Sequence, residues 1–182
     1  MDHGVERLIE IFRVANDDVI GSVARKIFNL KWKEGLSARN QAHKILDGLA
    51  LTKKITKGKG FFAVNEYRGE FKEHDRLVTD CIAKLILLKL PITIYRETAL
   101  PNGLRPDVIG LIGKDGKALS FVLECCLNET DSYFEQKVTF WKHHNPLEEV
   151  FKIPIPHFAL VVYGKQHPEA MDFEKFIEEV KK

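Results

Sequence analysis

The chain has 182 residues, of which 45% are hydrophobic and 30% are charged, and its net charge is +2. These values are ordinary for a globular protein with one domain or two small ones. The lack of a long apolar run and of a charged-then-apolar leader argues against membrane insertion and secretion, and three cysteines, two of them adjacent, predict a reducing, cytoplasmic setting without a disulfide framework.

The positive charge is concentrated in the first third of the chain. Residues 1–64 contain twelve Lys or Arg and seven Asp or Glu, whereas the remainder contains sixteen and nineteen. The segment from Arg25 to Lys59 contains ten basic residues and only two acidic ones. Such a basic segment on a mildly acidic body predicts contact with a polyanion, and the alternative is a solvated lysine-rich surface.

Three helices are predicted in this basic third. Apolar residues at helical spacing predict a short helix over residues 5–12. Asn16 is suited to cap a second helix over residues 17–28, which begins with two acidic residues. Ser37 is predicted to cap a third helix that runs to about Gly48. Two short strands, 51–56 and 61–64, follow, with a lysine- and glycine-rich turn over 57–60 between them.

Three helices followed by a basic hairpin resemble a winged helix-turn-helix domain over residues 1–66. In such a domain the third helix enters the major groove of double-stranded DNA and the hairpin lies against phosphates. The predicted base-edge and phosphate contacts are Arg39, Asn40, His43, Lys44, Lys53, Lys54, Lys57 and Lys59. Binding of a protein instead of DNA remains the alternative for this domain.

The second predicted domain covers residues 67–182. Helical spacing over 70–90 ends at Pro91, and a short strand over 92–95 follows. Strands over 108–112 and 119–127 flank a turn rich in Gly and Asp, which is typical of a hairpin. A helix over 132–143, a strand over 157–163 and a helix over 171–182 complete the order αβββαβα. This order predicts an α/β (α+β) fold with a mixed sheet covered on both faces.

Two carboxylates lie at the ends of the hairpin strands. Asp107 follows Pro106 directly, and Glu124 comes seventeen residues later within apolar sequence. A carboxylate in such surroundings is costly unless it is paired, hydrogen-bonded or bound to a metal. Two acids that meet across a hairpin predict a Mg²⁺ site, because Mg²⁺ is held by one or two carboxylates with waters and phosphate oxygens. The structural alternatives are a turn shaped by Asp107 and an ion pair of Glu124 with Lys137 or Arg105.

Together these features resemble the PD-(D/E)xK nuclease-like fold, and the whole chain resembles the replication-relaxation proteins of plasmids and mobile elements. The resemblance rests on the leading winged helix and on short motifs, which are Glu73-His74-Asp75-Arg76-Leu77, Arg105-Pro106-Asp107, and Leu123-Glu124 with Asn128-Glu129-Thr130 and Lys137 after it. It implies DNA as substrate or partner and Mg²⁺ or Mn²⁺ as the metal.

The resemblance also implies roles for individual residues. Asp107, Glu124 and the Cys125 carbonyl would hold the metal, and Glu73, with Glu70 as second choice, would complete its shell. His74 on the same predicted helix would contact the scissile phosphate or act as an acid.

One motif position departs from the family. Its lysine normally follows the strand acid by two residues, and here that position is Cys126. Lys137 on the next helix would then orient the attacking water and offset charge at phosphorus.

Three functions remain open on the sequence. The first is a metal-dependent DNA nicking or cleaving enzyme guided by its winged helix. The second is a catalytically inactive DNA-binding replication factor, which the cysteine at the motif position favours. The third is a transcriptional regulator whose second domain forms a homodimer, which requires a self-complementary apolar surface.

Overall fold

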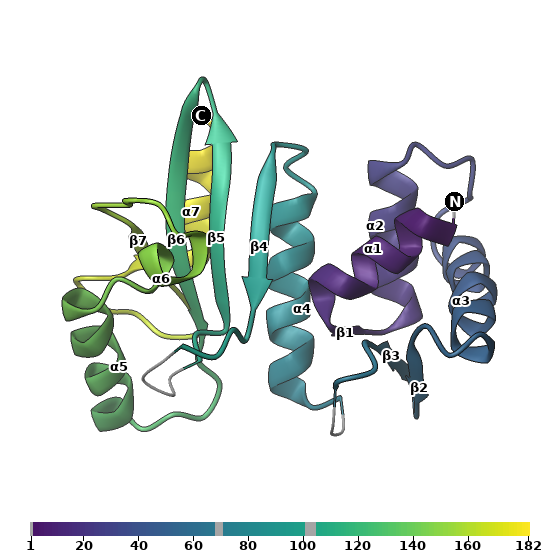
Figure 1. Ribbon diagram of the computed structural model, residues 1–182, viewed down its shortest axis with the longest axis horizontal. Helices are drawn as coiled ribbons and strands as arrows, with labels where there is room; N and C mark the ends of the chain where they lie inside the picture. Colours follow the sequence, from purple (N-terminus) through teal and green to yellow (C-terminus); the bar gives the residue numbers. More distant parts are fainter. Residues whose placement is uncertain (1, 68–70, 101–104) are drawn as a thin grey trace. The chain divides into compact units, whose positions relative to one another are not determined.

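The computed structural model describes residues 2–67, 71–100 and 105–182 (Figure 1). The chain divides into two compact units, Met1–Lys89 and Leu90–Lys182, each of which is described by itself. The division falls after helix α4 (Glu73–Ile86), whereas the sequence places the domain boundary before it, at residues 66 and 67. Among the described residues, none of the helices combines the length and the apolar character that a membrane crossing requires.

The first unit consists of helices around a small antiparallel sheet. Its sheet has the order β1-β3-β2, so the two-residue strand β1 lies at an edge. The elements in chain order are α1 (Asp2–Phe12), β1 (Val14–Ala15), α2 (Asp17–Ile27), α3 (Leu36–Leu51), β2 (Thr56–Gly58), β3 (Phe61–Ala63) and α4. The threonine hydroxyl of Thr79 on α4 donates to the Val14 carbonyl at 3.0 Å, which ties this helix to the sheet.

The first two predicted helices are confirmed. The apolar residues of α1 at helical spacing are buried, and the Asn16 side chain caps α2 by accepting a hydrogen bond from the Val19 N–H at 2.9 Å. Phe28 differs from the prediction, because α2 ends before it and its side chain is largely exposed.

The limits of the third helix differ from the prediction. Gly35, not Ser37, holds the N-cap position of α3, and the helix continues past Gly48 to Leu51. Thr52 explains the extension, because its hydroxyl donates to the carbonyls of the last turn and so satisfies groups that a helix end leaves open. The prediction of a strand over 51–56 is therefore wrong except at Thr56, because Leu51 belongs to α3 and the strand β2 covers Thr56–Gly58. The turn shortens to residues 59 and 60.

The second unit is built on a mixed five-stranded sheet with the order β4-β5-β6-β7-β8. The first three strands are antiparallel, and β7 and β8 are added in parallel. Its elements are β4 (Ile92–Arg96), β5 (Val108–Lys114), β6 (Lys117–Cys125), α5 (Asp131–His143), α6 (Pro146–Phe151), β7 (Ala159–Tyr163), β8 (Met171–Asp172) and α7 (Phe173–Lys181). The predicted mixed α/β fold is thus confirmed, and α6 and β8 are additions that the sequence pattern does not indicate.

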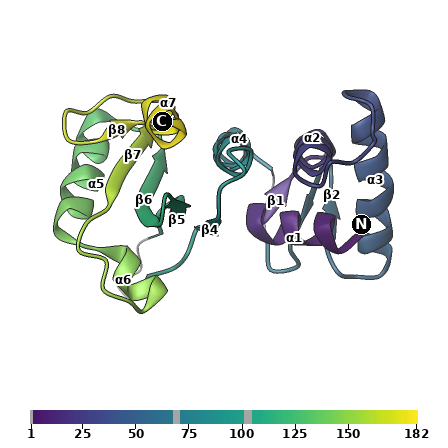
Figure 2. The ribbon, with the colours of Figure 1, turned by 90° about the horizontal axis from the view of Figure 1, so that it is seen from above.

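Helices cover both faces of this sheet (Figure 2). On one face, Phe134, Val138 and Trp141 of α5 belong to the same buried cluster as Ile109 and Val122 of the central strands. On the other face, Phe176 of α7 packs against Phe121 of β6, with ring centroids 5.3 Å apart. Because side chains alternate along a strand, each residue of the β5–β6 hairpin is assigned to the α5 face or the α7 face by its position.

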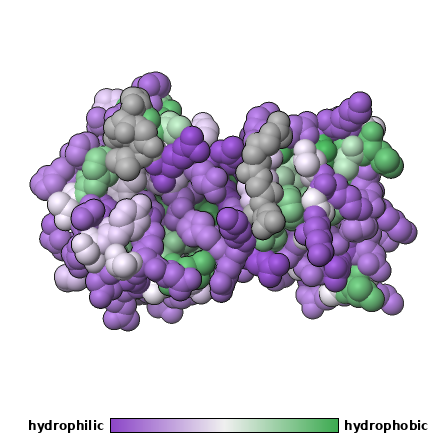
Figure 3. All heavy atoms as spheres, turned by 90° about the horizontal axis from the view of Figure 1, so that it is seen from below, coloured by the Kyte–Doolittle hydropathy of each residue, from purple (hydrophilic) through white to green (hydrophobic). Residues whose placement is uncertain are grey.

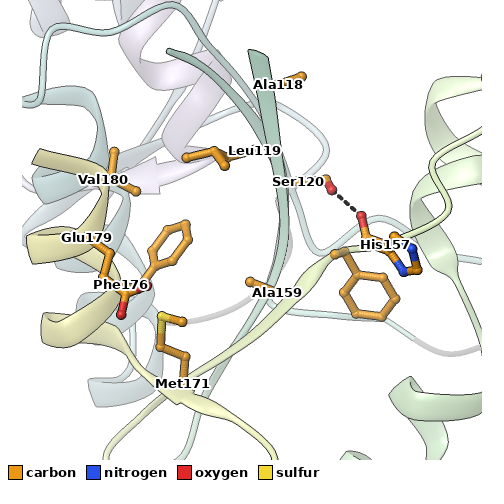
Figure 4. Close-up of a pocket in the computed structure, with 10 residues that line it drawn as sticks. Ala118, Leu119, Ser120, His157, Ala159, Met171, Phe176, Glu179 and Val180 are labelled. Atoms are coloured by element: carbon orange, nitrogen blue, oxygen red, sulfur yellow. Dashed lines mark hydrogen bonds between the residues drawn. The ribbon is translucent and has the colours of Figure 1, made fainter. Parts of the chain in front are cut away.

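A pocket lies at the edge of the sheet, beside α7, where β6 extends beyond β7 (Figure 4). Pairing with β7 begins only at Phe121, and before that point the Ser120 hydroxyl donates to the His157 carbonyl at 2.6 Å. The pocket encloses about 430 Å³ between this overhang, β8 and α7. On the side of the molecule drawn in Figure 3, hydrophobic residues form small separate groups within a mainly hydrophilic surface.

Replacing Gly164 with alanine is expected to destabilise the second unit by about 2 kcal/mol more than the same change at Gly116. Both glycines have a positive φ, 91° and 73°, which an L side chain rarely adopts. An added Cβ at residue 164 would lie 2.1 Å from the Cys126 carbonyl oxygen, whereas at residue 116 it would meet nothing within 4 Å. Urea denaturation measures the free energy of unfolding of both variants, and the difference between them reports the clash at residue 164. Equal losses of stability would contradict this prediction.

Candidate functional site

Asp107 and Glu124 lie at the same end of the β5–β6 hairpin and on the same face. The register pairs Val108 with Leu123, so its continuation places Asp107 opposite Glu124. Directly opposed residues of an antiparallel pair project to one face. That face is the one covered by α5, because Ile109 and Val122, two residues away on each strand, belong to the α5 cluster.

Both carboxylates are buried and hydrogen-bonded. Asp107 accepts the Cys125 backbone N–H at its Oδ2 atom, at 2.7 Å. Glu124, which is 2% exposed, accepts two bonds from α5: one from the Trp141 indole Nε1 at 2.7 Å and one from the Lys137 Nζ at 2.9 Å. The structure therefore brings Asp107, Glu124 and Lys137 together, as the sequence predicts.

Lys137 lies between two acids. Its Nζ atom also donates to Glu129 Oε1 at 2.8 Å and lies 5.5 Å from the centre of the Tyr133 ring. Burial alone would lower the pKa of the Lys137 ammonium, but the carboxylates of Glu124 and Glu129 outweigh it and hold the pKa above its ordinary value. Lys137 is thus a fixed cation at neutral pH and balances part of the buried negative charge.

Burial and the carboxylate of Asp107 disfavour the ionised form of Glu124. Burial, and after it the nearby Asp107 carboxylate, raises the pKa of Glu124 to about 7, although Lys137 and Trp141 act in the opposite direction. A raised pKa with a specific charged neighbour, at the edge of a pocket, is a feature that functional sites share. The pocket holds about 480 Å³ and is lined by Glu124, Lys137, Trp141, Arg105, Tyr133, Gln136 and Phe140.

The two adjacent cysteines face opposite sides of the sheet. Cys126 belongs to the α5 cluster and is near Glu129, and burial together with this carboxylate raises the pKa of its thiol to about 12. It therefore stays protonated at neutral pH and cannot supply the positive charge of the lysine that the nuclease resemblance implies at this position. Cys125 supplies its N–H to Asp107, and the predicted use of its carbonyl stays a prediction.

The donor set at this site fits a divalent cation of the Mg²⁺ type. Mg²⁺ needs one or two protein carboxylates, with waters and phosphate oxygens as the remaining ligands. Asp107 and Glu124 provide two mutually repelling carboxylates, which a cation would stabilise. Within residues 2–67, 71–100 and 105–182, no three His, Cys, Asp or Glu side chains gather closely enough to form a complete protein cage for a metal.

The predicted shell residue Glu73 and the predicted phosphate contact or acid, His74, lie elsewhere in the chain. Glu73 and His74 belong to the first turn of α4, in the first unit. Glu73 is exposed and His74 is half-buried. Their part in the carboxylate site of the second unit stays a prediction, and Glu70 lies outside the described residues.

The predicted DNA-contacting residues form two groups. Asn40, Lys44, Lys53 and Lys59 are exposed. Arg39, His43, Lys54 and Lys57 are also on the surface but lie beside carboxylates of the same unit, which are those of Asp17, Asp18, Asp47 and Glu6. Pairs of this kind at a surface contribute about 1 kcal/mol or less, so a phosphate can replace such a carboxylate.

Sequence reasoning missed two members of the carboxylate site. It gave no role to Trp141, a buried residue of α5 whose indole N–H donates to Glu124. It also left Glu129 without a role, although this residue shares the Lys137 ammonium. The sequence does contain a signal that Trp141 lies near the site, since Trp141 and Lys137 are four residues apart and therefore lie on one side of a helix.

Comparisons with known proteins give no match. No family model fits this chain, and no curated protein or solved structure is similar enough to indicate a relationship. The geometry of the two units is therefore the basis for the functional argument.

Proposed function

We propose that this chain is a DNA-binding protein whose second unit cleaves or nicks phosphodiester bonds with a divalent metal ion, as in plasmid or mobile-element replication. One observation carries the proposal: Asp107, directly before β5, lies opposite Glu124 of β6, and Lys137 of α5 donates to Glu124. Two like charges that are buried together lower the stability of the folded protein. Binding of a cation would offset this cost, and carboxylates perturbed in this way are typical of functional sites.

Each residue has a defined task in this proposal. Asp107 and Glu124 would hold Mg²⁺ or Mn²⁺, which when bound polarises a phosphoryl oxygen and lowers the pKa of a water. Lys137 keeps a positive charge beside the pocket and would orient the attacking water toward phosphorus. Trp141 and Glu129 fix the orientation of Glu124 and Lys137, respectively, through their hydrogen bonds.

The first unit supports a role in DNA binding. Its order α1-β1-α2-α3-β2-β3, with β1 paired to β3, is the arrangement that a winged helix requires. In this arrangement α3 would enter the major groove and the β2–β3 turn would contact the backbone. The exposed residues Asn40 and Lys44 on α3 and Lys59 in the turn carry suitable groups for these contacts.

A second candidate is a DNA-binding factor that no longer cleaves. Two observations favour it. Both Glu124 oxygens already accept hydrogen bonds, and the thiol of Cys126 occupies the position of the family lysine. In this case Lys137 and Glu124 form a structural ion pair.

Incubation of supercoiled plasmid with the full chain tests the proposal. Conversion to the open circular form is expected with Mn²⁺ and not with EDTA, and Glu124→Gln is expected to lose it. Binding of plasmid without any conversion would favour the second candidate. Conversion that Glu124→Gln retains would assign the cleavage to another site or a contaminant.

Removing two exposed lysines of the first unit is expected to weaken duplex binding about tenfold at low salt. Lys44→Ala with Lys59→Ala removes two phosphate contacts, so the slope of log affinity against log salt should fall by about two. The matched control is Lys117→Ala with Lys152→Ala, which removes two exposed lysines of the second unit. Fluorescence anisotropy of a labelled duplex measures both, and equal losses in the two double variants would count against the winged-helix assignment.

A further inference from the structure

The pocket beside Glu124 has aromatic walls as well as charges. Tyr133, Phe140 and Trp141 of α5 supply three of its seven lining residues, and Arg105 and Lys137 supply positive charge. Tyr133 is 52% exposed, which leaves its ring accessible from solvent. A phosphate alone needs no such walls, whereas a nucleotide has an aromatic base and an anionic phosphate on one small molecule.

A second hollow continues from this pocket along α5. It shares Gln136 and Phe140 with the first and extends to His143 and His144 at the end of the helix. The Phe140 and His144 rings are stacked, with centroids 4.0 Å apart and planes inclined by 7°. Such a pair offers a flat surface on which the next base of a strand can lie. Both hollows belong to the second unit.

Burial of Glu124 limits which phosphates can reach the site. Its side chain is 2% exposed, and its carboxylate lies behind Lys137 and Trp141 in a pocket of about 480 Å³. This volume is that of a small-molecule pocket. A base-paired duplex keeps its bases stacked inside a broad cylinder, and unstacking one of them costs a few kcal/mol. A nucleotide that is already unpaired enters without this cost.

We propose that the α5 pocket binds an unpaired nucleotide, so that the site acts on single-stranded segments, loops or ends of a nucleic acid. This inference rests on the proposed function of the same site. The base lies against Tyr133 and Phe140, its phosphate is directed to Arg105 and Lys137, and the neighbouring base lies on the Phe140–His144 pair. The acidic residues around the two hollows are Asp107, Glu124 and Glu129, whose charge Lys137 offsets in part, and Glu135, which is paired with His167.

Binding of short oligonucleotides in EDTA tests this inference without cleavage. We expect the full chain to bind a fluorescent eight-nucleotide single strand through the pocket, and Tyr133→Ala to weaken this binding roughly tenfold. Phe140→Leu keeps an apolar side chain of similar size, removes the aromatic face, and should have a similar effect. The control is Tyr95→Ala, which removes an exposed tyrosine of β4 and should leave binding unchanged. Affinity for a long duplex should not change in any of the three variants.

Three outcomes would overturn the inference. Tyr133→Ala and Phe140→Leu could bind the single strand as tightly as Tyr95→Ala does. Both variants could lose duplex and single-strand binding equally. A free nucleoside monophosphate could displace the oligonucleotide at equal concentration, which would identify a mononucleotide site instead of a strand site.

Failure of the proposed cleavage and failure of the nucleotide pocket give different experimental results. If Glu124→Gln abolishes nicking while Tyr133→Ala binds single strands normally, the proposed cleavage stands and the nucleotide pocket falls. If wild-type protein nicks nothing but Tyr133→Ala still loses single-strand binding, the pocket stands and the cleavage falls.

Discussion

Replacing Glu124 with glutamine is expected to lower Mn²⁺-dependent nicking of supercoiled plasmid by at least about a hundredfold. Glutamine has nearly the same size and its carbonyl can still accept the Trp141 indole N–H, so the packing of α5 on the sheet is kept. The change removes the negative charge that a divalent cation requires. Lys137 retains Glu129 as a partner, at 2.8 Å, so its ammonium is not left unpaired.

The matched control for this prediction is Glu169→Gln. Glu169 is an exposed residue of the same unit and is paired with Lys142, so its change to glutamine removes an equal charge outside the pocket lining. Initial rates of loss of the supercoiled form should be equal for wild type and Glu169→Gln. A rate for Glu124→Gln within a few-fold of wild type would show that this carboxylate takes no part in cleavage.

The positions of the two strand carboxylates could be predicted from the sequence because hairpin signals are local. The turn residues Asp115 and Gly116, both with positive φ, fix where the chain reverses. Once the reversal is fixed, the register assigns Asp107 and Glu124 to opposite positions and one face. Lys137 follows from helical spacing, since it shares a side of α5 with Trp141.

The hydrogen bonds at the site could not be predicted in the same way. Helical spacing places Trp141 on the buried side of α5, but which acceptor its indole N–H meets depends on the distance and rotation of α5 relative to β6.

The short strands could not be predicted for a different reason, which is their length. Strands β1 and β8 contain two residues each, too few for any alternation of apolar and polar side chains to show.

Charge counting gave the excess of positive charge in the first third of the chain but not which basic residues are paired with carboxylates. His43 on α3 lies 2.9 Å from Asp17 of α2, although the two residues are 26 apart in the chain. Lys57 reaches Asp47 at 2.7 Å across a helix end and a turn. Such contacts arise from tertiary packing, and they reduce the positive charge available to a polyanion at these positions.

In the absence of metal, the stability of the second unit is expected to fall as the pH rises from 5 to 8. Glu124 has a pKa of about 7 in the folded protein against 4.5 as its ordinary value, so between these values the folded state binds more protons than the unfolded state. Stability is then lost with rising pH, and the loss is complete above about pH 7. A shift of this size corresponds to a loss on the order of 3 kcal/mol.

Urea denaturation in EDTA at several pH values measures this effect. The chain has two tryptophans, Trp32 in the first unit and Trp141 beside Glu124 in the second. A Trp32→Phe background therefore leaves a fluorescence signal that follows the second unit alone. In this background, Glu124→Gln removes the titrating group. The free energy of unfolding of this variant should therefore change between pH 5 and 8 by about 3 kcal/mol less than that of the parent protein.

Addition of Mg²⁺ at pH 8 should reverse the loss, because a cation that binds only the folded state raises its stability according to its concentration and affinity. The gain should occur in the Trp32→Phe background and be absent, or much smaller, when Glu124→Gln is added. This result would identify Asp107 and Glu124 as cation ligands without reference to cleavage. Parallel pH profiles for the two proteins, with equal responses to Mg²⁺, would instead mean that Lys137 and Trp141 keep Glu124 ionised and that the pair is a structural one.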